Sequence, residues 1–262
     1  MKILSGKQPH ARRTLIYGVH GVGKSTLASQ APDVVFLNIE DGLADINCSR
    51  TEQLRDFDSV LESLRWLYSQ KHEFKSVAID TIDWLEQLIF QAVAREANKE
   101  SVGEIAYGKG YDLAVAKWEK LFLALDFLRK ERGMHVIALC HCDVVKHTAP
   151  DADSYDRYQP ALHKSSVNTW QEWCDEVLFA NYRVFTRKTD EGFGRSRTVA
   201  MGEGERFLQT QETATALAKN RLRMPTEIDF SWKAYASYFE SQNINGVVVN
   251  GSSKKEKELI NG

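Results

Sequence analysis

Three glycines, a lysine and a serine stand close together in "GVHGVGKST", near the start of the sequence. Their spacing, from Gly18 through Gly23 and Lys24 to Ser25, is G-x-x-x-x-G-K-S. In such a loop the backbone N–H groups surround an anion, the lysine reaches the β- and γ-phosphates, and the hydroxyl binds Mg²⁺. A chance glycine-rich turn is the alternative. We predict an ATP and Mg²⁺ site formed by Gly18, Val19, His20, Gly21, Val22, Gly23, Lys24, Ser25 and Thr26.

Two acidic positions could complete this site. Asp80 ends the apolar run "SVAID", where a carboxylate can hold the metal ion, usually through water. Its alternative role is to cap the helix that follows. Glu40 and Asp41 end the earlier run "VVFLNIED", at the sheet edge where α/β folds bind ligands. Glu40 could activate a water molecule for hydrolysis, and solvated charge at a strand end is the alternative.

His141 ends another apolar run, "MHVIALCH", where its side chain could contact the γ-phosphate and report its loss. A zinc site is the competing interpretation, because cysteine and histidine cluster here. On a strand, however, Cys140 and Cys142 face away from His141, and their spacing differs from that of structural zinc sites. We expect the cysteines to be core residues. The zinc candidates are Cys140, His141, Cys142 and His147.

Apolar runs and amphipathic patterns alternate along the chain and would position these residues. Nearly continuous apolar strands between helices predict an α/β fold, with a mostly parallel sheet flanked by helices. Residues 142–170 show no clear periodicity and are expected to form a polar loop, residues 176–210 resemble short strands of an antiparallel extension, and residues 231–242 resemble a closing helix. We predict strands at 14–18, 34–39, 76–80 and 134–141, and helices at 24–30, 51–70, 84–96 and 113–131.

Composition limits the class of protein. The 262 residues, 43% hydrophobic and 27% charged, suit one domain at 1–243 with a disordered tail at 244–262. Four cysteines form no disulfide framework in a chain of this size. The absence of a long apolar run argues against a membrane span, so we expect a cytoplasmic protein. A net charge of −2 requires any nucleic-acid binding to use local patches.

The order of these motifs resembles that of RecA-like P-loop ATPases. Further along, "AKNRLRMP" contains Lys219-Asn220-Arg221, which is similar to the K-N-R motif of bacterial RadA-type proteins. The compact form resembles phage RecA-like single-strand annealing proteins, the Sak-four group related to UvsX and RecA. The resemblance covers roughly residues 12 to 242 in motif order, although no separate N-terminal oligomerisation domain precedes the first strand.

The resemblance implies a role for each motif. Lys24 and Ser25 would hold the phosphates and Mg²⁺, Asp80 would hold the metal through water, Glu40 would be the base, and His141 would sense the γ-phosphate. The resemblance also implies that Lys219 and Arg221 act on ATP bound to a neighbouring subunit, which makes hydrolysis depend on assembly. The protein would form a homo-oligomeric ring or filament on single-stranded DNA. Its setting would be the cytoplasm of a bacterial host.

In RecA-like proteins, two DNA-facing loops follow the third and fourth core strands, which here means about 100–112 and 142–169. Aromatic residues interleaved with cations suit a single-strand platform, because bases stack and phosphates pair. Four aspartates, at 143, 151, 153 and 156, oppose this in the second loop. A basic stretch could contribute or be a solvated hairpin; it holds Arg183, Arg187, Lys188, Arg195 and Arg197. The DNA-binding candidates are Tyr107, Lys109, Tyr111, Lys146, His147, Arg157, Tyr158 and Lys164.

We therefore predict a DNA-dependent ATPase that binds single-stranded DNA and promotes strand annealing or homologous recombination. Its partners would be DNA, further copies of itself and an ssDNA-binding protein. One alternative is an annealing module that ATP switches with little hydrolysis. Another is a small-molecule P-loop kinase, which would need an acceptor pocket and an arginine-rich lid. The position of Glu40 and the K-N-R motif argue against the kinase.

Overall fold

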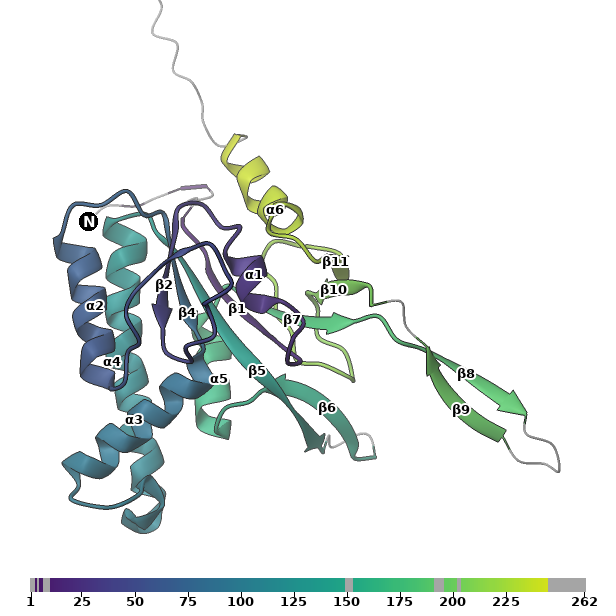
Figure 1. Ribbon diagram of the computed structural model, residues 1–262, viewed down its shortest axis with the longest axis horizontal. Coiled ribbons are helices and arrows are strands. Elements are labelled where there is room, and N and C mark those ends of the chain that lie inside the picture. Colours follow the sequence, from purple (N-terminus) through teal and green to yellow (C-terminus); the bar gives the residue numbers. More distant parts are fainter. Residues whose placement is uncertain are drawn as a thin grey trace, which may run out of the picture.

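The computed structural model describes residues 3, 5–6, 10–148, 153–190, 196–201 and 204–244. A mostly parallel sheet forms its centre, in the strand order β11-β10-β7-β1-β5-β4-β2-β3 (Figure 1). This arrangement is the predicted α/β class. The strands are β1 (Arg13–Gly18), β2 (Val34–Asn38), β3 (Ser49–Arg50), β4 (Ser76–Asp80), β5 (His135–His147), β7 (Glu176–Tyr182), β10 (Arg206–Gln209) and β11 (Glu227–Asp229).

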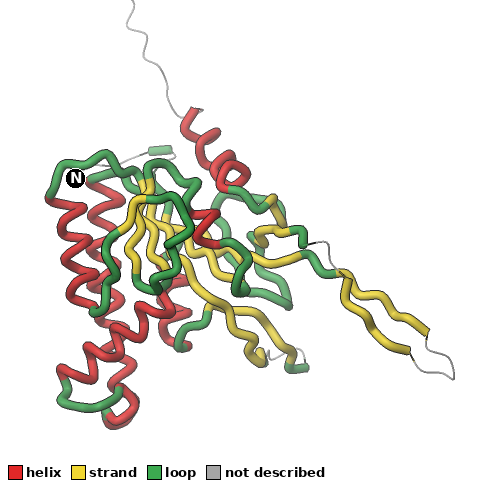
Figure 2. Tube along the Cα trace, in the orientation of Figure 1, coloured by secondary structure: helices red, strands yellow, loops and turns green. Residues whose placement is uncertain are grey.

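Helices cover both faces of the sheet, as the alternation along β1 requires. Leu15 and Tyr17 pack into a core with α2 to α5, whereas Ile16 packs on the other face with α1 and α6. Figure 2 shows the strands gathered between these helices. The helices are α1 (Lys24–Ala28), α2 (Phe57–Ser69), α3 (Ile82–Glu96), α4 (Lys109–Glu131), α5 (Lys164–Trp173) and α6 (Trp232–Ile244), with short 3₁₀ turns at Val102–Glu104 and Ala106–Gly108.

The helix predicted at 51–70 begins later than expected, at Phe57. Asp56 caps it, because its carboxylate accepts a hydrogen bond from the Ser59 N–H at 2.7 Å. Residues 51–56 form neither helix nor strand and run along the edge of the sheet instead. The Leu54 N–H donates to the carbonyl of Asn38, and β3 pairs with β2. Leu54 is therefore buried at the sheet edge and not on a helix.

The prediction of an irregular segment at 142–170 is wrong. β5 continues past the sheet to His147 and pairs antiparallel with β6 (Tyr155–Pro160), after which α5 begins. This β5–β6 ribbon leaves the sheet at His141, which lies beside Gly18 in the β1–β5 register. Polar residues occupy both faces of the ribbon, so it lacks the apolar alternation that marks a half-buried strand.

The antiparallel extension predicted at 176–210 is present in part. β10 is antiparallel to β7, and β11 is antiparallel to β10. β7 itself is parallel to β1 and belongs to the central sheet. Between them, β8 (Phe185–Asp190) and β9 (Ser196–Met201) form a separate ribbon that projects from the body (Figure 1).

Two expectations concern the chain as a whole. Within the described ranges, no helix has the length and apolar character needed to cross a bilayer. The tail predicted to be disordered falls outside the described residues from 245 onward, and α6 extends to Ile244.

Candidate nucleotide-binding site

The glycine-rich loop connects the end of β1 to the start of α1, as a phosphate-binding loop requires. Gly23 lies just before α1 with φ of 94°, and Gly21 has φ of 73°. Both values fall in the left-handed region, which glycine enters without steric cost. Gly18 is needed for another reason, because a Cβ atom there would lie 2.1 Å from the Ala180 carbonyl oxygen. The loop thus depends on backbone freedom and on close packing of β7.

A cleft of about 260 Å³ opens at the carboxyl ends of β1, β2, β4 and β5. It brings together the candidate residues from four separate parts of the sequence. Parallel strands end at the same edge of a sheet, which explains why residues far apart in the chain meet here. The lining residues are His20, Gly21, Gly23, Lys24, Ser25, Thr26, Glu40, Gly42, Ile46, Asp80, Thr81 and His141.

Lys24 is buried inside the loop. Its ammonium donates hydrogen bonds to the carbonyls of Gly18 at 3.0 Å and Val19 at 3.2 Å. Burial lowers the pKa of Lys24, because desolvation disfavours the charged form. Both of these acceptors are neutral, and a phosphate would interact with the ammonium more strongly. The loop and its lysine therefore fit a nucleotide phosphate.

Ser25 and Asp80 lie together on the floor of the cleft. Asp80 is only 4% exposed and accepts a hydrogen bond from the Ser25 hydroxyl. Burial, together with the nearby charge of Glu40, raises the pKa of Asp80 to about 6. A hydroxyl and a carboxylate are ligands that Mg²⁺ accepts, often through water. These residues fit a magnesium ion, which would neutralise phosphate charge when bound.

Glu40 and His141 face each other across the cleft. The Thr81 hydroxyl donates to the Glu40 carboxylate at 3.1 Å, and His141 Nε2 lies 3.7 Å from Glu40 Oε1. On the opposite side, the Asp83 carboxylate accepts a hydrogen bond from the His141 backbone N–H at 3.1 Å. Its second oxygen lies 2.8 Å from His141 Nδ1. Burial alone would raise the pKa of Asp83, but these bonds to His141 lower it. The carboxylate of Asp83 thus fixes the orientation of the imidazole.

A family model described as an AAA domain (AAA_24) matches residues 10–222. The chain belongs to this AAA domain family. A solved crystal structure of the RadB recombinase is similar to the chain, with a TM-score of 0.47 and 14% sequence identity over 83% of this chain and 85% of that one. Among curated proteins, no sequence matches it.

Lys219 and Arg221 of this AAA domain lie away from the P-loop of their own chain. Lys219 bridges to Val177 near the start of β7, whereas the P-loop follows the carboxyl end of β1. Its ammonium donates to three carbonyls at the end of α5, those of Gln171 at 2.6 Å, Glu172 at 3.2 Å and Cys174 at 2.8 Å. Arg221 pairs with Asp175 at 3.2 Å, and its side chain is 54% exposed. Their predicted action on a neighbouring subunit's nucleotide stays a prediction.

The DNA-binding candidates divide by exposure. Tyr107 is 97% exposed, and Lys109, Lys146 and Lys164 are also exposed. His147 and Tyr111 are half-buried, and Tyr111 stacks on His163 with ring centroids 4.1 Å apart.

Two candidates in β6 do not lie on the surface as expected. Arg157 is 6% exposed and pairs with Glu212 at 2.6 Å. Tyr158 packs against the core, with its ring stacked on Phe179 at 4.9 Å. Both side chains are buried because the segment at 212–217 packs against β6. The Leu217 N–H donates a hydrogen bond to the Tyr158 carbonyl there. We therefore leave these two residues out of the DNA surface.

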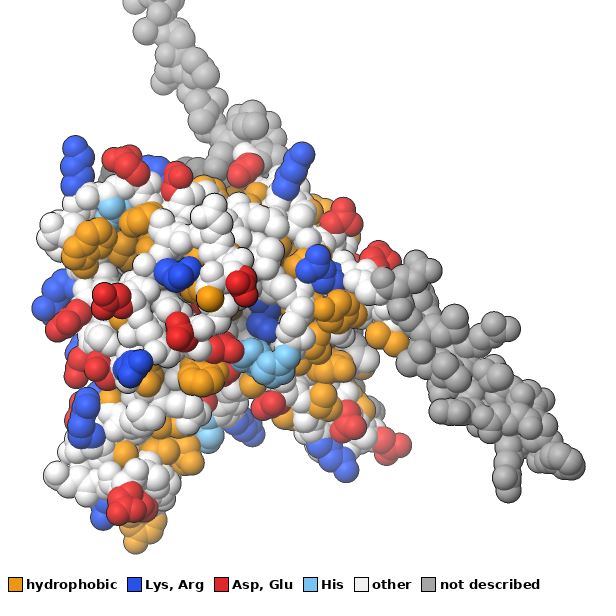
Figure 3. Space-filling model, in the orientation of Figure 1, with side chains coloured by type: hydrophobic (Ala, Val, Ile, Leu, Met, Phe, Trp, Pro, Cys, Tyr) orange, Lys and Arg blue, Asp and Glu red, His pale blue; other side chains and the backbone are white. Residues whose placement is uncertain are grey.

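Within the basic stretch, the side chain of Arg183 is described, at the root of the β8–β9 ribbon. There Arg183 pairs with Glu205 at 3.2 Å and with Glu227 at 3.0 Å. Residues 191–195, which include Arg195, lie outside the described residues, as does Asp151 in the earlier loop. Figure 3 shows basic and acidic side chains interspersed over the visible face of the molecule.

The zinc candidates differ in solvent exposure, since Cys140 is buried and the other three are half-buried. Cys140 is fully enclosed in the core, and burial raises the pKa of its thiol. Among the residues that the structure describes, no group of three or more His, Cys, Asp or Glu side chains is arranged to hold a metal ion.

Two residues that the sequence analysis missed hold the P-loop from outside. The Tyr182 hydroxyl donates to the Gly21 carbonyl at 3.0 Å, and Arg206 Nη1 donates to the Val22 carbonyl at 3.1 Å. The Arg206 guanidinium also lies over the Phe230 ring, 4.8 Å from its centroid. No motif marks these residues, which lie more than 150 positions from the loop. Asp83 was also missed, although its place in "AIDTID", one turn after Asp80, could have indicated it.

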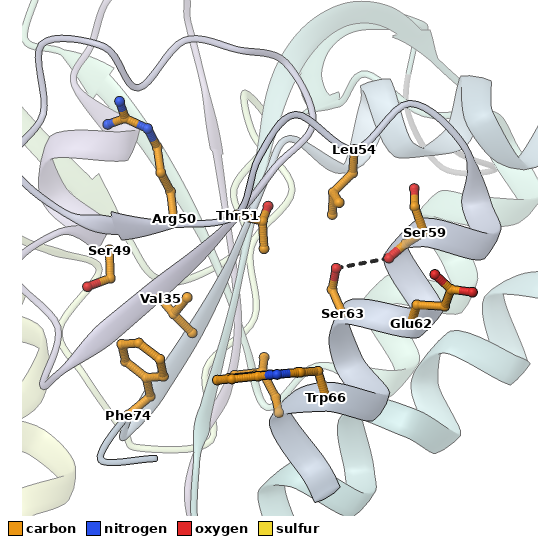
Figure 4. Close-up of a pocket in the computed structure, with 11 residues that line it drawn as sticks. Val35, Ser49, Arg50, Thr51, Leu54, Ser59, Glu62, Ser63, Trp66 and Phe74 are labelled. Atoms are coloured by element: carbon orange, nitrogen blue, oxygen red, sulfur yellow. Dashed lines mark hydrogen bonds between the residues drawn. The ribbon is translucent and has the colours of Figure 1, made fainter. Parts of the chain in front are cut away.

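A larger hollow of about 560 Å³ lies elsewhere, between β2, β3 and α2 (Figure 4). Val35, Leu54, Trp66 and Phe74 make its lining mostly apolar. None of the nucleotide-site candidates lines it. Size alone therefore does not identify the nucleotide site, which is the smaller and more polar cleft.

Proposed function

We propose that this AAA domain is an ATP-dependent, RecA-like protein that binds single-stranded DNA and promotes strand annealing or homologous recombination. The observation that carries the proposal is the cleft itself. It brings a P-loop lysine, a serine–aspartate pair, a glutamate and a histidine together at the carboxyl ends of four strands, which supports the proposal. A phage protein acting in the bacterial cytoplasm, beside an ssDNA-binding protein, fits this activity.

ATP would bind with its phosphates inside the loop. The loop N–H groups and the start of α1 would face the phosphates, and Lys24 would exchange its two carbonyl partners for phosphate oxygens. Ser25 and Asp80 would hold Mg²⁺, which supplies charge neutralisation when bound. His141 Nε2, which points toward Glu40, would contact the γ-phosphate.

Hydrolysis would begin at Glu40. Its carboxylate would accept a proton from water as the water oxygen bonds to the γ-phosphorus, and the bond to the bridging oxygen would break to release ADP. Thr81 orients this carboxylate through the hydrogen bond at 3.1 Å. His141 lies 3.7 Å from the Glu40 carboxylate and would respond to both the base and the phosphate.

A second subunit would complete the site, and Lys219 and Arg221 would have different roles. Lys219 already has three carbonyl acceptors at the end of α5, so we assign it mainly to stability. Arg221 is half-exposed and makes one ion pair, so it is the better candidate for the cation that reaches a neighbour's ATP.

The DNA surface would include the exposed candidates at the start of α4, on β5 and at the start of α5: Tyr107, Lys109, Lys146 and Lys164. A fully exposed tyrosine is available for base stacking, and the lysines are available for phosphates. These contacts do not select a sequence, which suits a protein that anneals arbitrary strands.

ATP turnover titrated against single-stranded DNA, together with the mass of the assembled species, tests the proposal. We expect DNA to stimulate hydrolysis and ATP to tighten DNA binding, and we expect Lys24→Ala to abolish both effects. The proposal fails if DNA neither stimulates turnover nor binds more tightly with ATP.

One observation favours an ATP-switched annealing module as the second candidate. Thr81 already binds one oxygen of the Glu40 carboxylate, and His141 lies near the other, which would slow proton transfer from water. Glu40→Ala separates the two functions. If annealing survives this substitution but is lost with Lys24→Ala, ATP binding alone suffices.

A further inference from the structure

His20 occupies a variable position of the P-loop motif, where the motif requires no particular side chain. In the structure its exposed ring stacks on the ring of His141, with centroids 4.0 Å apart and planes 16° apart. This contact joins the P-loop to the strand end that carries the proposed γ-phosphate contact, His141. None of the roles assigned above uses it.

Asp83 and Glu40 contact the ring nitrogens and the backbone of His141, whereas His20 contacts a face of its ring. Asp83 fixes the backbone N–H and Nδ1, and Nε2 points toward Glu40. The stacked ring of His20 covers one face of the imidazole. Movement of the P-loop at His20 would therefore act directly on His141.

Lys24 connects phosphate binding to His20. In the structure it binds the carbonyls of Gly18 and Val19, the two residues directly before His20. A phosphate attracts the same ammonium more strongly than neutral carbonyls do. Binding of ATP would therefore release these carbonyls and free the segment that carries His20.

His141 in turn stands at the root of the β5–β6 ribbon. It is the last β5 residue paired with β1, and its carbonyl accepts a hydrogen bond from the Ala161 N–H at 2.9 Å, just past the end of β6. The next residue, Cys142, pairs with Pro160 as the ribbon begins. A shift of His141 would therefore displace both strands of the ribbon.

We propose that His20 is a positioning residue that transmits nucleotide occupancy of the P-loop to the β5–β6 ribbon through its stack on His141. The inference rests on the proposed binding of ATP, but it needs neither hydrolysis nor DNA. It gives the ribbon two states that depend on whether Lys24 binds its own loop or a phosphate.

Hydrogen exchange measured by mass spectrometry tests this inference on the full chain. Peptides covering 142–148 and 153–160 would be compared with and without a non-hydrolysable ATP analogue and Mg²⁺. We expect the wild-type ribbon to change its exchange rate by about threefold or more when the analogue binds. A fluorescent ATP analogue would measure binding separately.

Two substitutions separate stacking from folding. His20→Ala should lose the ribbon response even at analogue concentrations that saturate the variant, because the loop can still bind phosphate through its backbone. His20→Phe should restore the response, because an aromatic ring can stack on His141. His72→Ala is the matched control, since His72 stacks on Trp66 outside the cleft and should leave the response intact.

The outcomes decide the inference in each case. A retained ribbon response in His20→Ala, or a wild-type ribbon that ignores bound analogue, would overturn it. Failure of His20→Phe to restore the response would also count against stacking as the mechanism. If the wild-type protein binds no analogue, the proposed function fails first and the inference falls with it.

Discussion

At the scale of single residues, the nucleotide cleft is built from groups that are costly to bury. Lys24 is 7% exposed and Asp80 is 4% exposed, and neither forms an ion pair that would offset its desolvation in the described structure. Such groups are kept where a ligand supplies the opposite charge. ATP and Mg²⁺ would supply those charges here.

Asp80 should make stability depend on pH. Its pKa of about 6 in the folded protein lies above the ordinary value of 3.8. The stabilising, protonated form is thus fully present below about pH 4 and is lost as pH rises through 6. At pH 7.5 the ionised carboxylate costs up to about 3 kcal/mol.

Asp80→Asn should therefore raise the Tm of the ligand-free protein at pH 7.5 and have little effect near pH 4. The same substitution should remove the extra stabilisation that Mg²⁺ adds to ATP binding. Thermal unfolding measured across this pH range checks both effects. A Tm difference that does not vary with pH would contradict the explanation from burial.

At the scale of elements, the P-loop is held by strands that come much later in the sequence. β7 ends at Tyr182 and β10 begins at Arg206, and both residues bind carbonyls on the outer side of the loop. The loop conformation therefore depends on the C-terminal extension as well as on its own glycines.

Arg206→Gln should weaken nucleotide binding by about tenfold or more, because a charge-assisted hydrogen bond contributes roughly 1.5–3 kcal/mol. Tyr182→Phe should have a smaller effect, since it removes one neutral hydrogen bond. Titration with a fluorescent ATP analogue measures both. Equal affinity of the Arg206 variant and the wild type would show that the loop does not need this support.

The end of α5 depends on Lys219, which binds three of its terminal carbonyls. Lys219→Met should lower the free energy of unfolding by about 1–3 kcal/mol, because it leaves these acceptors without their charged partner. Arg221→Gln should cost less than about 1 kcal/mol, since Asp175 also pairs with Arg13. Denaturant unfolding compares the two variants. The assignment is wrong if Arg221→Gln proves the more destabilising.

At the scale of the whole molecule, the proposed mechanism would require a second chain to complete the site. The candidate trans-acting cation, Arg221, lies near the start of β7, while the P-loop lies at the carboxyl ends of the strands. One subunit's Arg221 would serve a neighbour's ATP only in a head-to-tail assembly, which closes into a ring or continues as a filament.

Mixing two inactive variants tests this arrangement. Lys24→Ala loses its own nucleotide, and Arg221→Gln loses the cation that it would give to a neighbour. In an equal mixture, roughly a quarter of the contacts would pair an intact P-loop with an intact Arg221, so ATPase activity should reappear. Activity that stays at the level of the separate variants would exclude a shared site.

Local patterns predicted most of the fold. Apolar runs identified β1, β2, β4 and the start of β5, and helical spacing identified α3 and α4, because these elements are buried and their periodicity records it. The β5–β6 ribbon escaped prediction because its two faces are both partly polar. Arg157 was misassigned for a related reason, since sequence alone cannot tell an exposed arginine from one paired in the interior.

The sequence by itself determined the phosphate loop, since G-x-x-x-x-G-K-S encodes the turn, the lysine and the hydroxyl within eight consecutive residues. It also placed Glu40, Asp80 and His141 at strand ends. Only the tertiary structure decided that His20 stacks on His141, that Asp83 orients His141, and that Tyr182 and Arg206 hold the loop. Motifs record interactions between near neighbours in the chain, whereas these contacts arise from the packing of loops, helices and strands that lie far apart in sequence.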